Sequence, residues 1–393
     1  MIIDNGLAAL SQRMQMIERA QKSIYLETFI LYPHISSRLL LQKLMAKARQ
    51  GLDVRILVDK NPFASFNPFH IQELNKAGVK VKFYNSGIFL NLIKVQHRDH
   101  RKIFLIDGQE AIVGGRNIAD EYFSMGEKYN FLDLDLWLLG PMAQVLEKSF
   151  LEYWNHPWSQ NPRPAPKRPT PERIDLKRYS GKTYERMVDW KRQEEYQLYQ
   201  WIKAGEASNK FFTRDNALAQ KDLYYQQKMV NVSQHRGSCR HMVLSTNPAG
   251  QNLYHNEVGR HLYQLFLQAK QELIIESPYF IVHAPECSLF SKILGNGVKV
   301  SLLTNGLRAQ KDSSVMFSSI FQNRIIFLTN KGLMTYVYRG YSLEGEADAI
   351  PQGMHVPIWG VHGKAMVIDD KTSIIGSYNL DPHSKNFNNE LMM

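Results

Sequence analysis

The sequence predicts an α/β protein made of two similar lobes that are related by an approximate two-fold axis. Two observations lead to this prediction. The same order of strand-like and helix-like segments occurs once in each half of the chain, which indicates an internal repeat. Within each half, short apolar strands alternate with helical stretches, as is typical of a sheet covered by helices. The chain has 393 residues, of which 44% are hydrophobic, and this is ample for two cores.

Three pairs of repeated segments carry the prediction. In the first pair, the end of a helix leads into a buried strand that ends in glutamate, at Glu27 in one half and at Glu276 in the other. In the second and third pairs, a glycine turn leads into a strand of β-branched and aromatic residues. The paired segments are 20–27 with 269–276, 51–58 with 297–304 and 78–84 with 332–338, and helices are expected at 37–50 and 254–268.

The segment between the halves has a different composition. Residues 157–171 contain six prolines, which predict a stiff, extended connector. Residues 183–203 then read as a helix rich in tyrosine and tryptophan. We expect this helix to pack across the lobes, and a helix on a membrane surface is the alternative. The predicted division is a first lobe at 1–156, a connector with a helical insert at 157–240 and a second lobe at 241–393.

The fourth repeated element has the pattern H-x-K-x4-D-x6-G-[GS]-x-N in both halves, with identical spacing. A single His-x-Lys on a strand is usually an ordinary surface feature, but two copies in register indicate catalysis. The two sets of candidate residues are His100, Lys102, Asp107, Gly115 and Asn117 in the first half, and His362, Lys364, Asp369, Ser377 and Asn379 in the second.

The spacing of this motif has a physical reason. Histidine and lysine two apart on a strand point to the same face. Four apolar residues then anchor the strand in the core, the aspartate turns the chain, and a second apolar strand returns to the same edge. There it delivers the asparagine together with Gly115 or Ser377, whose small size leaves room for a phosphate near the backbone.

An approximate two-fold axis would bring both sets of residues around one phosphate. The lysines and the amide donors would stabilise charge on the phosphoryl oxygens. One neutral histidine can attack phosphorus, while the other, when protonated, donates to the leaving alkoxide. An incoming hydroxyl then resolves the phosphohistidine. This chemistry requires no metal and no other cofactor, so we expect none. Because the two histidines interact, they should titrate as a coupled pair.

Each histidine also needs an acceptor on its other ring nitrogen. Glu390 is the candidate for His362, and Asp133 is the counterpart for His100. Glu27 and Glu276 either line the site or cap strand ends. Asp107 and Asp369 are candidates for a direct chemical role, with a purely structural turn as the alternative.

The charge indicates the kind of partner, and the cysteine content favours a reducing compartment. The formal net charge of +11 favours anionic partners such as phospholipid headgroups, nucleic acid or other phosphates. The two cysteines, Cys239 and Cys287, lack the spacing of a zinc site and are expected to be free thiols. No signal peptide and no apolar run of about 18 residues is visible, so a substrate in a membrane would be reached from its surface.

The duplicated motif resembles that of the phospholipase D superfamily. The similarity is greatest to bacterial cardiolipin synthases, particularly the C-type group that lacks N-terminal spanning helices. The likeness covers nearly the whole chain and is weakest from about 160 to 235. Besides the motif, the likeness rests on the short segments Glu27-Thr28-Phe29-Ile30, Gly114-Gly115-Arg116-Asn117, Asp133-Leu134-Asp135, Ser277-Pro278-Tyr279-Phe280 and Gly376-Ser377-Tyr378-Asn379-Leu380-Asp381-Pro382.

The resemblance implies two phospholipase D-type lobes, each a mixed sheet flanked by helices, with the site at their interface. It implies transfer of a phosphatidyl group to phosphatidylglycerol, with His100 as nucleophile and His362 as general acid. The expected partners are anionic phospholipid, namely phosphatidylglycerol with phosphatidylethanolamine as a further candidate, and a membrane surface, but no nucleic acid. The expected location is the periphery of the inner, cytoplasmic membrane of a bacterium.

Two departures from the family pattern affect these expectations. His383 stands where the family usually carries arginine, which puts a phosphate or structural contact there in doubt. Glu390 is followed by only three residues, whereas relatives continue for tens of residues, so the second lobe is expected to be short at its C-terminal end. Glu390 is therefore expected to lie on a terminus that frays.

Three other functions remain open from the sequence. Water in place of the lipid hydroxyl would make the chain a phospholipase D that releases phosphatidic acid. A metal-independent nuclease of the same superfamily would also be basic, and a scaffold without activity is the fourth possibility. The apolar segment 87–93 would either dip into a membrane interface or form a core strand.

Overall fold

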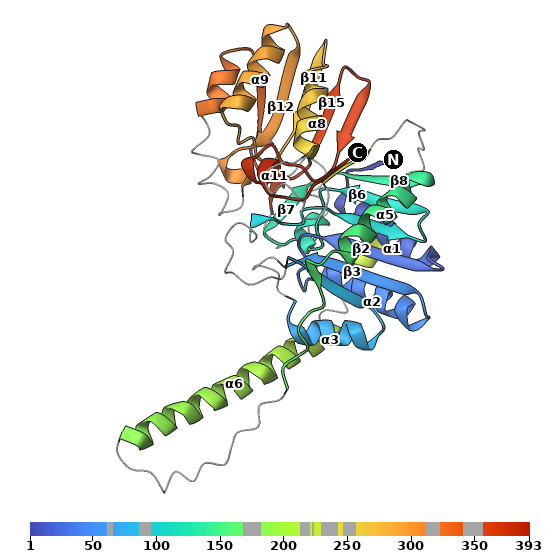
Figure 1. Cartoon of the computed structure of the whole chain (residues 1–393), viewed down its shortest axis with the longest axis vertical. Helices are drawn as coiled ribbons and strands as arrows, with labels where there is room; N and C mark the ends of the chain where they lie inside the picture. The colour runs from blue at the N-terminus through green and yellow to red at the C-terminus, as the bar shows by residue number, and fades with distance from the viewer. Residues whose placement is uncertain are drawn as a thin grey trace.

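A computed structural model describes residues 1–60, 66–85, 96–167, 182–212, 221, 224–228, 243–246, 257–310, 323–340 and 357–393. Within these residues, strands and helices form two α/β lobes that stack end to end (Figure 1). The predicted fold class is confirmed, because each lobe is a mixed sheet flanked by helices. The segment 87–93 and Cys239 lie outside the described residues, and Cys287 is a buried free thiol.

The first lobe is built on an eight-stranded sheet of order β1-β8-β6-β5-β2-β3-β4-β9. Its centre is parallel where β2, β3 and β4 pair, and antiparallel from β2 through β5 and β6 to β8. The strands are β1 (Ile2–Ile3), β2 (Ser23–Thr28), β3 (Asp53–Asp59), β4 (Lys80–Tyr84), β5 (Ile103–Ile106), β6 (Glu110–Gly114), β8 (Asp135–Leu139) and β9 (Ser159–Gln160). The sheet thus extends beyond residue 156, where the sequence placed the end of the lobe.

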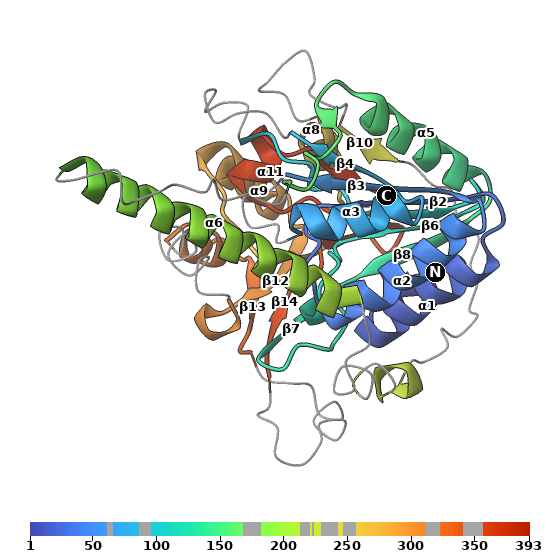
Figure 2. The same cartoon turned by 90° about the horizontal axis from the view of Figure 1, so that it is seen from below.

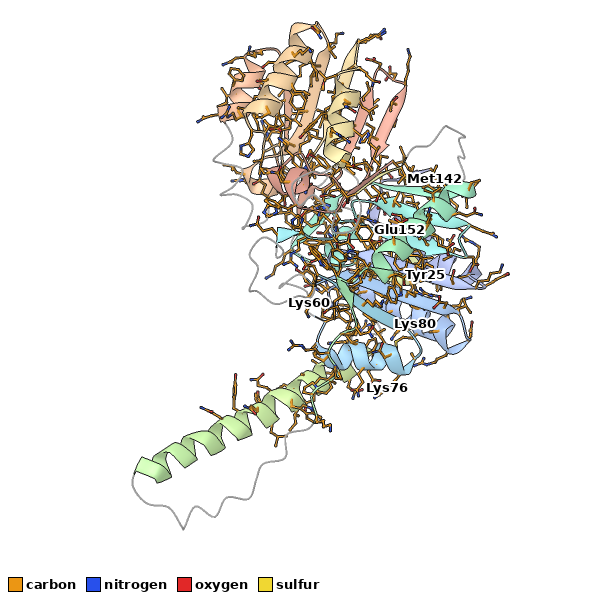
Figure 3. All side chains as sticks on the ribbon, in the orientation of Figure 1. Tyr25, Lys60, Lys76, Lys80, Met142 and Glu152 are labelled. Carbon is orange, nitrogen blue, oxygen red and sulfur yellow. The ribbon has the colours of Figure 1, made fainter. Side chains whose placement is uncertain are left out.

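Helices cover both faces of this sheet, which explains why its central strands are apolar throughout. On one face lie α1 (Gly6–Arg19), α2 (Ile35–Arg49) and α3 (Pro68–Lys76), packed on residues such as Ile24 and Ile56. On the other face, α5 (Pro141–Asn155) packs Phe150 on Tyr25 with stacked rings 4.9 Å apart. Basic side chains such as Lys76 and Lys80 project from the outer edge of this lobe (Figure 3).

The second lobe has a five-stranded sheet of order β13-β12-β11-β15-β16. Its elements repeat the first lobe in order: parallel β11, β12 and β13, then antiparallel β15 and β16. Their bounds are α8 (Glu257–Phe266), β11 (Glu272–Glu276), α9 (Ala284–Gly295), β12 (Lys299–Asn305), β13 (Met334–Tyr338), β15 (Ala365–Ile368) and β16 (Thr372–Ile375). The face that corresponds to the one under α5 is open among the described residues: Ile274 is 40% exposed, whereas its counterpart Tyr25 is 7% exposed.

Short strand pairings join the lobes. β7 (Tyr129–Leu132) of the first lobe pairs in parallel with β14 (Ile358–Val361) of the second. An isolated bridge links Asp99 of the first lobe to Asn389 of the second, and within the second lobe β10 (Leu244–Ser245) pairs with β17 (Leu391–Met392). The expectation that Glu390 frays is wrong, because these contacts hold it fully buried next to β17. The interface therefore fixes the residues around both motifs.

The insert forms a long helix, α6 (Lys182–Phe212), that projects from the first lobe (Figures 1 and 2). Its C-terminal half packs on α2 and α3, for example through Phe211 and His70, whose rings lie 5.2 Å apart. The expectation of a helix packed across both lobes is therefore wrong, since its described packing is with the first lobe. No helix in the described ranges combines the length and apolar character needed to span a bilayer.

Candidate active site

Both motifs lie at the interface of the lobes, next to strands that occupy equivalent places. His100 and Lys102 come just before β5, in an extended segment, and not within the strand as the sequence suggested. After β5 the chain turns and returns along β6 to Gly115 and Asn117. Both histidines are 7% exposed and both lysines are buried. The site is thus enclosed, yet each imidazole keeps a small accessible surface.

The histidines are held by carboxylates from the opposite lobes. Nδ1 of His362 lies 2.6 Å from Oδ2 of Asp133, and Nδ1 of His100 lies 3.1 Å from Oε2 of Glu390. The sequence paired Glu390 with His362 and Asp133 with His100, and this assignment is wrong. The parallel pairing of β7 with β14 places residue 133 beside residue 362, so the partners cross the interface.

These contacts define the tautomer of both rings. The Nδ1 of His100 also faces the carbonyl oxygen of Ser377 at 3.0 Å, so both oxygens within hydrogen-bond distance of that nitrogen are acceptors. A proton on Nδ1 therefore donates to these oxygens, and Nε2 keeps its lone pair. Nδ1 of His362 faces both Oδ2 of Asp133 at 2.6 Å and Nζ of Lys364 at 3.0 Å, and the shorter contact favours the same tautomer there. Each ring thus presents Nε2 as its reactive nitrogen.

Glu390 is itself fixed by a set of polar side chains that the sequence did not reveal. Its Oε1 accepts from the hydroxyl of Ser384 at 2.8 Å and from Nδ2 of Asn388 at 3.2 Å. The hydroxyl of Ser377 donates to Oε2, and the Glu390 amide donates to Oγ1 of Thr246 at 2.8 Å. The Ser-x-x-x-x-x-Glu spacing of residues 384 and 390 was the only available signal for part of this network.

The two lysines lie next to the histidines, and their charges interact with each other. Each Nζ donates to the carbonyl oxygen of the histidine in its own motif, and Nζ of Lys364 lies 3.0 Å from Nδ1 of His362. Burial lowers the pKa of Lys102 to about 7 and the pKa of Lys364 to about 8, and the charge of Lys364 further lowers the pKa of Lys102. An anion that enters the site would stabilise both ammonium groups.

Both imidazoles are neutral near pH 7. Burial lowers the pKa of His362 to about 3, and the adjacent Lys364 acts in the same direction. Burial and Lys102 likewise lower the pKa of His100, against the opposing effect of Glu390. Although burial alone would raise it, the pKa of Asp133 is lowered by His362 and Lys364, so this carboxylate stays charged. Neutral imidazoles beside carboxylates are suited to nucleophilic attack.

Small residues and carboxamides surround the same space. A Cβ at Gly115 would collide with the carboxylate of Asp133, so glycine lets β6 approach that side chain. The Oδ1 of Asn117 accepts from the backbone amide of Ile30 at 3.1 Å, and its side chain is also hydrogen-bonded to the hydroxyl of Tyr122. The Oδ1 of Asn379 is buried without a hydrogen-bond partner among the described residues. The two carboxamides are thus held differently.

The motif aspartates lie at the far ends of β5 and β15 from the histidines. Asp107 accepts from the backbone amides of residues 21–23 at 2.7–2.9 Å, and Asp369 accepts in the same way from residues 270–272 at 2.8–2.9 Å. Both have positive φ angles, 54° and 52°. This geometry favours the structural-turn alternative, in which each aspartate ties the motif strand to the start of the central strand.

The two glutamates at the strand ends have different surroundings. Glu27 is buried against Arg101, whose Nε lies 3.1 Å from Oε1 and whose Nη2 donates to Oε2 at 3.1 Å. In the second lobe Gly363 replaces Arg101, and the carboxylate of Glu276 occupies the space of the absent side chain. Burial and the charge of Asp133 raise the pKa of Glu276 to about 7. Glu27 is thus paired, whereas Glu276 lies beside the catalytic set.

Aromatic rings flank both imidazoles and were not predicted from the sequence. Phe29 meets His100 edge-on at 5.1 Å, and Tyr122 and Phe131 meet His362 at 5.1 and 4.8 Å. His383 is exposed with its ring 5.8 Å from Phe387, so it makes no described contact with either motif. Within the described ranges, no group of three or more His, Cys, Asp or Glu side chains could hold a metal ion.

We expect kcat/KM to decline as the pH rises through about 7 to 8, because Lys102 and Lys364 lose their charges in that range. Lys102→Arg should keep its charge and move the decline to higher pH. The measurement is kcat/KM for a phosphodiester between about pH 5.5 and 9.5 in the wild type and in this variant. A basic limb that stays in place in both Lys102→Arg and Lys364→Arg would contradict the assignment.

The two motifs thus form one enclosed site, in which each histidine has a carboxylate across the interface and a lysine beside it. Comparisons with known proteins specify the family. A family model described as cardiolipin synthase, phospholipase D-like domain, matches residues 14–154 and 262–393. The chain belongs to this family of phospholipase D-type phosphatidyltransferases.

Individual relatives extend over nearly the whole chain. Cardiolipin synthase C of Escherichia coli is 25% identical over 412 residues, which cover 99% of this chain and 79% of that protein. An uncharacterized protein of Helicobacter pylori is 27% identical over 404 residues, covering 99% and 74% of the two chains. The crystal structure of phosphatidylserine synthase from Haemophilus influenzae has the same fold, with a TM-score of 0.61 at 15% identity, over 100% of this chain and 80% of that one.

Proposed function

We propose that this protein is a cardiolipin synthase-like enzyme that moves a phosphatidyl group from one phospholipid to the hydroxyl of another through a phosphohistidine. The observation that carries the proposal is the crossed pair of hydrogen bonds, His100 with Glu390 and His362 with Asp133. Because these bonds occupy Nδ1 of each ring, Nε2 of each ring stays available, and two lysines lie beside the rings. These groups are what in-line displacement at a phosphodiester requires.

In the first half-reaction, Nε2 of His100 attacks phosphorus as the bond from phosphorus to the headgroup oxygen breaks. The leaving alkoxide takes a proton from Nε2 of His362. His362 is neutral before the anionic phosphate binds. The bound phosphate raises the pKa of His362, which then takes up this proton. Asp133 then stabilises the imidazolium through Nδ1.

In the second half-reaction, a hydroxyl of phosphatidylglycerol attacks the phosphohistidine. His362, now neutral, takes the proton of that hydroxyl, the bond between phosphorus and His100 breaks, and cardiolipin leaves. The assignment of His100 as the nucleophile follows the family resemblance. Lys102, Lys364 and the NH₂ groups of Asn117 and Asn379 hold the phosphoryl oxygens in both steps.

A membrane surface is the proposed working environment, at the cytoplasmic face of the inner membrane of a bacterium. The net charge of +11 attracts the protein to anionic lipid. Phosphatidylglycerol serves as acceptor, and phosphatidylglycerol or phosphatidylethanolamine as donor. Hydrolysis to phosphatidic acid is the second candidate, because the same residues serve when water is the acceptor, but the aromatic rings against both imidazoles favour transfer.

The test is a lipid-product assay. Purified protein is incubated with phosphatidylglycerol vesicles, with and without phosphatidylethanolamine, and products are identified by mass spectrometry. We expect cardiolipin from the wild type and from the matched control His261→Ala, whose histidine lies on α8 away from the motifs. His100→Ala and His362→Ala should yield none. Phosphatidic acid without cardiolipin would identify a hydrolase, and cleavage of DNA in place of lipid would sink the proposal.

A further inference from the structure

The second lobe exposes apolar side chains around β13, an edge strand of its sheet in the part of the chain that the structure describes. Tyr336 and Val337, which are neighbours on this strand, are 58% and 52% exposed. Further large apolar side chains of comparable exposure lie on adjoining segments: Leu307, Ile326, Phe327 and Ile358. A continuous exposed apolar surface on a folded protein usually marks a site of interaction with a protein or a membrane.

Contacts between these segments make the surface continuous. The short helix η3 (Leu307–Ala309) touches β14, and both lie at the end of β13. An added Cβ at Gly306 would meet the side chain of Val337 at 2.9 Å. At the other end of the turn, an added Cβ at Gly340 would meet the side chain of Ile358 at 3.3 Å. The exposed residues of η3, β13 and β14 are therefore neighbours in space.

The helix at 323–329 extends this surface along β13. The hydroxyls of Thr329 and Thr335 are hydrogen-bonded at 3.2 Å, which ties the end of the helix to the strand. Nζ of Lys331 lies 5.2 Å from the ring centroid of Phe327, so a cation lies over one of the exposed apolar side chains. The β13 patch is defined as Leu307, Ile326, Phe327, Tyr336, Val337 and Ile358 together with the exposed cations Arg308, Lys331 and Arg339.

The charge of the β13 patch is basic throughout. Its described segments, 305–310, 323–340 and 357–361, contain no acidic residue. Lys128 of the first lobe adds an exposed cation beside it, because the carbonyl oxygen of Lys128 accepts from the amide of Ile358 at 3.0 Å. A surface that is both apolar and basic is suited to an anionic amphiphilic partner.

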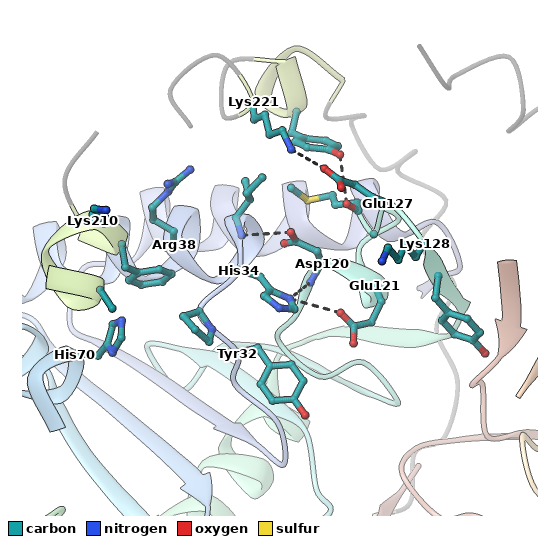
Figure 4. Close-up of a pocket in the computed structure, with 18 residues that line it drawn as sticks. Tyr32, His34, Arg38, His70, Asp120, Glu121, Glu127, Lys128, Lys210 and Lys221 are labelled. Atoms are coloured by element: carbon teal, nitrogen blue, oxygen red, sulfur yellow. Dashed lines mark hydrogen bonds and ion pairs between the residues drawn. The ribbon is translucent and has the colours of Figure 1, made fainter. Parts of the chain in front are cut away.

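The charges around the patch favour a bilayer over a second copy of the chain. Glu127 precedes Lys128 in the sequence, and its carboxylate already pairs with Nζ of Lys221 at 2.6 Å (Figure 4). A two-fold dimer through the patch would place the same cations against each other. An anionic bilayer instead attracts lysine and arginine, and its interface accepts tyrosine and aliphatic side chains.

The β13 patch is also close to the second motif. β14 begins at Ile358 and ends at Val361, and His362 follows it directly. With a rise of about 3.3 Å per residue, the exposed start of β14 lies within about 13 Å of His362. A bilayer at the patch would therefore lie near the catalytic pair.

We propose that the β13 patch docks the protein on an anionic lipid bilayer, with its apolar side chains in the interfacial region and its cations at the lipid phosphates. The inference rests on the proposed function, in which both substrates are bilayer lipids that the enzyme reaches from the membrane surface. It assigns that contact to one face of the second lobe, beside the strand that leads into His362.

The test is co-sedimentation with vesicles made of equal parts of phosphatidylcholine and phosphatidylglycerol. We expect the wild type to bind these vesicles, and to bind vesicles of phosphatidylcholine alone far more weakly. Leu307→Ser with Val337→Ser should weaken binding to the mixed vesicles by about tenfold or more, because the apolar contacts are lost. The matched control is Leu139→Ser with Val145→Ser, at positions of the first lobe that are 46% and 48% exposed, and it should bind as the wild type does.

A second pair of variants tests the charge and keeps the experiment informative if the serine variant folds poorly. Lys331→Glu with Arg339→Glu should weaken binding to the mixed vesicles by about tenfold or more. Lys76→Glu with Lys80→Glu makes the same change in net charge at the outer edge of the first lobe and should weaken binding much less (Figure 3). Circular dichroism checks that each variant is folded.

A wild type that does not bind the mixed vesicles would overturn the proposal, as would patch variants that bind normally or controls that lose as much. A wild-type dimer in light scattering that becomes a monomer in the patch variants would assign the patch to a second copy and also overturn it. Turnover of monomeric dihexanoylphosphatidylglycerol should be the same in the patch variants and the wild type, since both motifs are unchanged. A wild type that binds vesicles through the patch but turns over no lipid would count against the proposed function alone.

Discussion

His100→Asn and His362→Asn should each lower kcat/KM for lipid substrates by about 10³-fold or more, because one loses the nucleophile and the other the proton carrier. A substrate whose leaving group departs without a proton separates the two roles. With bis(4-nitrophenyl) phosphate, His362→Asn should release one equivalent of nitrophenolate in a burst and then stall as the phosphohistidine, since no base remains to activate water. His100→Asn should show no burst.

The covalent adduct provides an independent measurement. Intact-protein mass spectrometry of His362→Asn after the burst should show a single added phosphoryl ester, and peptide mapping should place it on His100. An adduct on His362 in the His100→Asn variant would reverse the assignment of roles. A burst from neither variant, combined with full wild-type activity, would rule out a histidine intermediate altogether.

Asp133→Asn should lower kcat by about 10²–10⁴-fold, because the amide can present its NH₂ to Nδ1 of His362 and so favour the wrong tautomer. Because each carboxylate pairs with the histidine of the other lobe, the two carboxylate variants should differ in which step they slow. Asp133→Asn should behave like the His362 variant and accumulate the adduct, although Asp133 belongs to the lobe of His100. Glu390→Gln should impair the nucleophile His100, so the adduct should form slowly and should not accumulate.

Burst kinetics on both carboxylate variants check this forecast, with thermal unfolding as the measure of folding. Glu73→Gln changes a half-buried glutamate on α3, paired with Lys76 and far from both motifs in the sequence, and should leave both the burst and the turnover as in the wild type. The arrangement would be contradicted by the opposite pattern, in which Asp133→Asn shows no burst and Glu390→Gln traps the adduct.

The sequence predicts much of this molecule because it contains the repeat twice. The α/β lobes and the strands of both sheets follow from apolar periodicity and glycine turns, which are local signals. The carboxylate partners of the histidines could not be predicted from the sequence. In a symmetric repeat, the sequence pattern fits a contact within one lobe and a contact across the interface equally well. Only the pairing of β7 with β14 decides between them, and that is a contact between residues about 229 positions apart.

The remaining differences from prediction also depend on tertiary contacts. Glu390 is near the end of the sequence, where fraying is the usual expectation, but its carboxylate accepts hydrogen bonds from four side chains and its amide donates to Thr246. The tilt of α6 away from the body depends on the contacts of its last turns with α2 and α3. No periodic pattern within the helix contains that information.

The exchange of carboxylates between lobes has a consequence for how the duplicated gene can vary. Duplication normally creates a spare copy, which is free to accumulate changes while the other maintains activity. Under the proposed function neither half is spare, because a change at residue 133 removes the partner of the histidine in the other half, and a change at residue 390 does the same in return. We therefore expect the two halves to vary as one unit, each limited to changes that the other can accommodate.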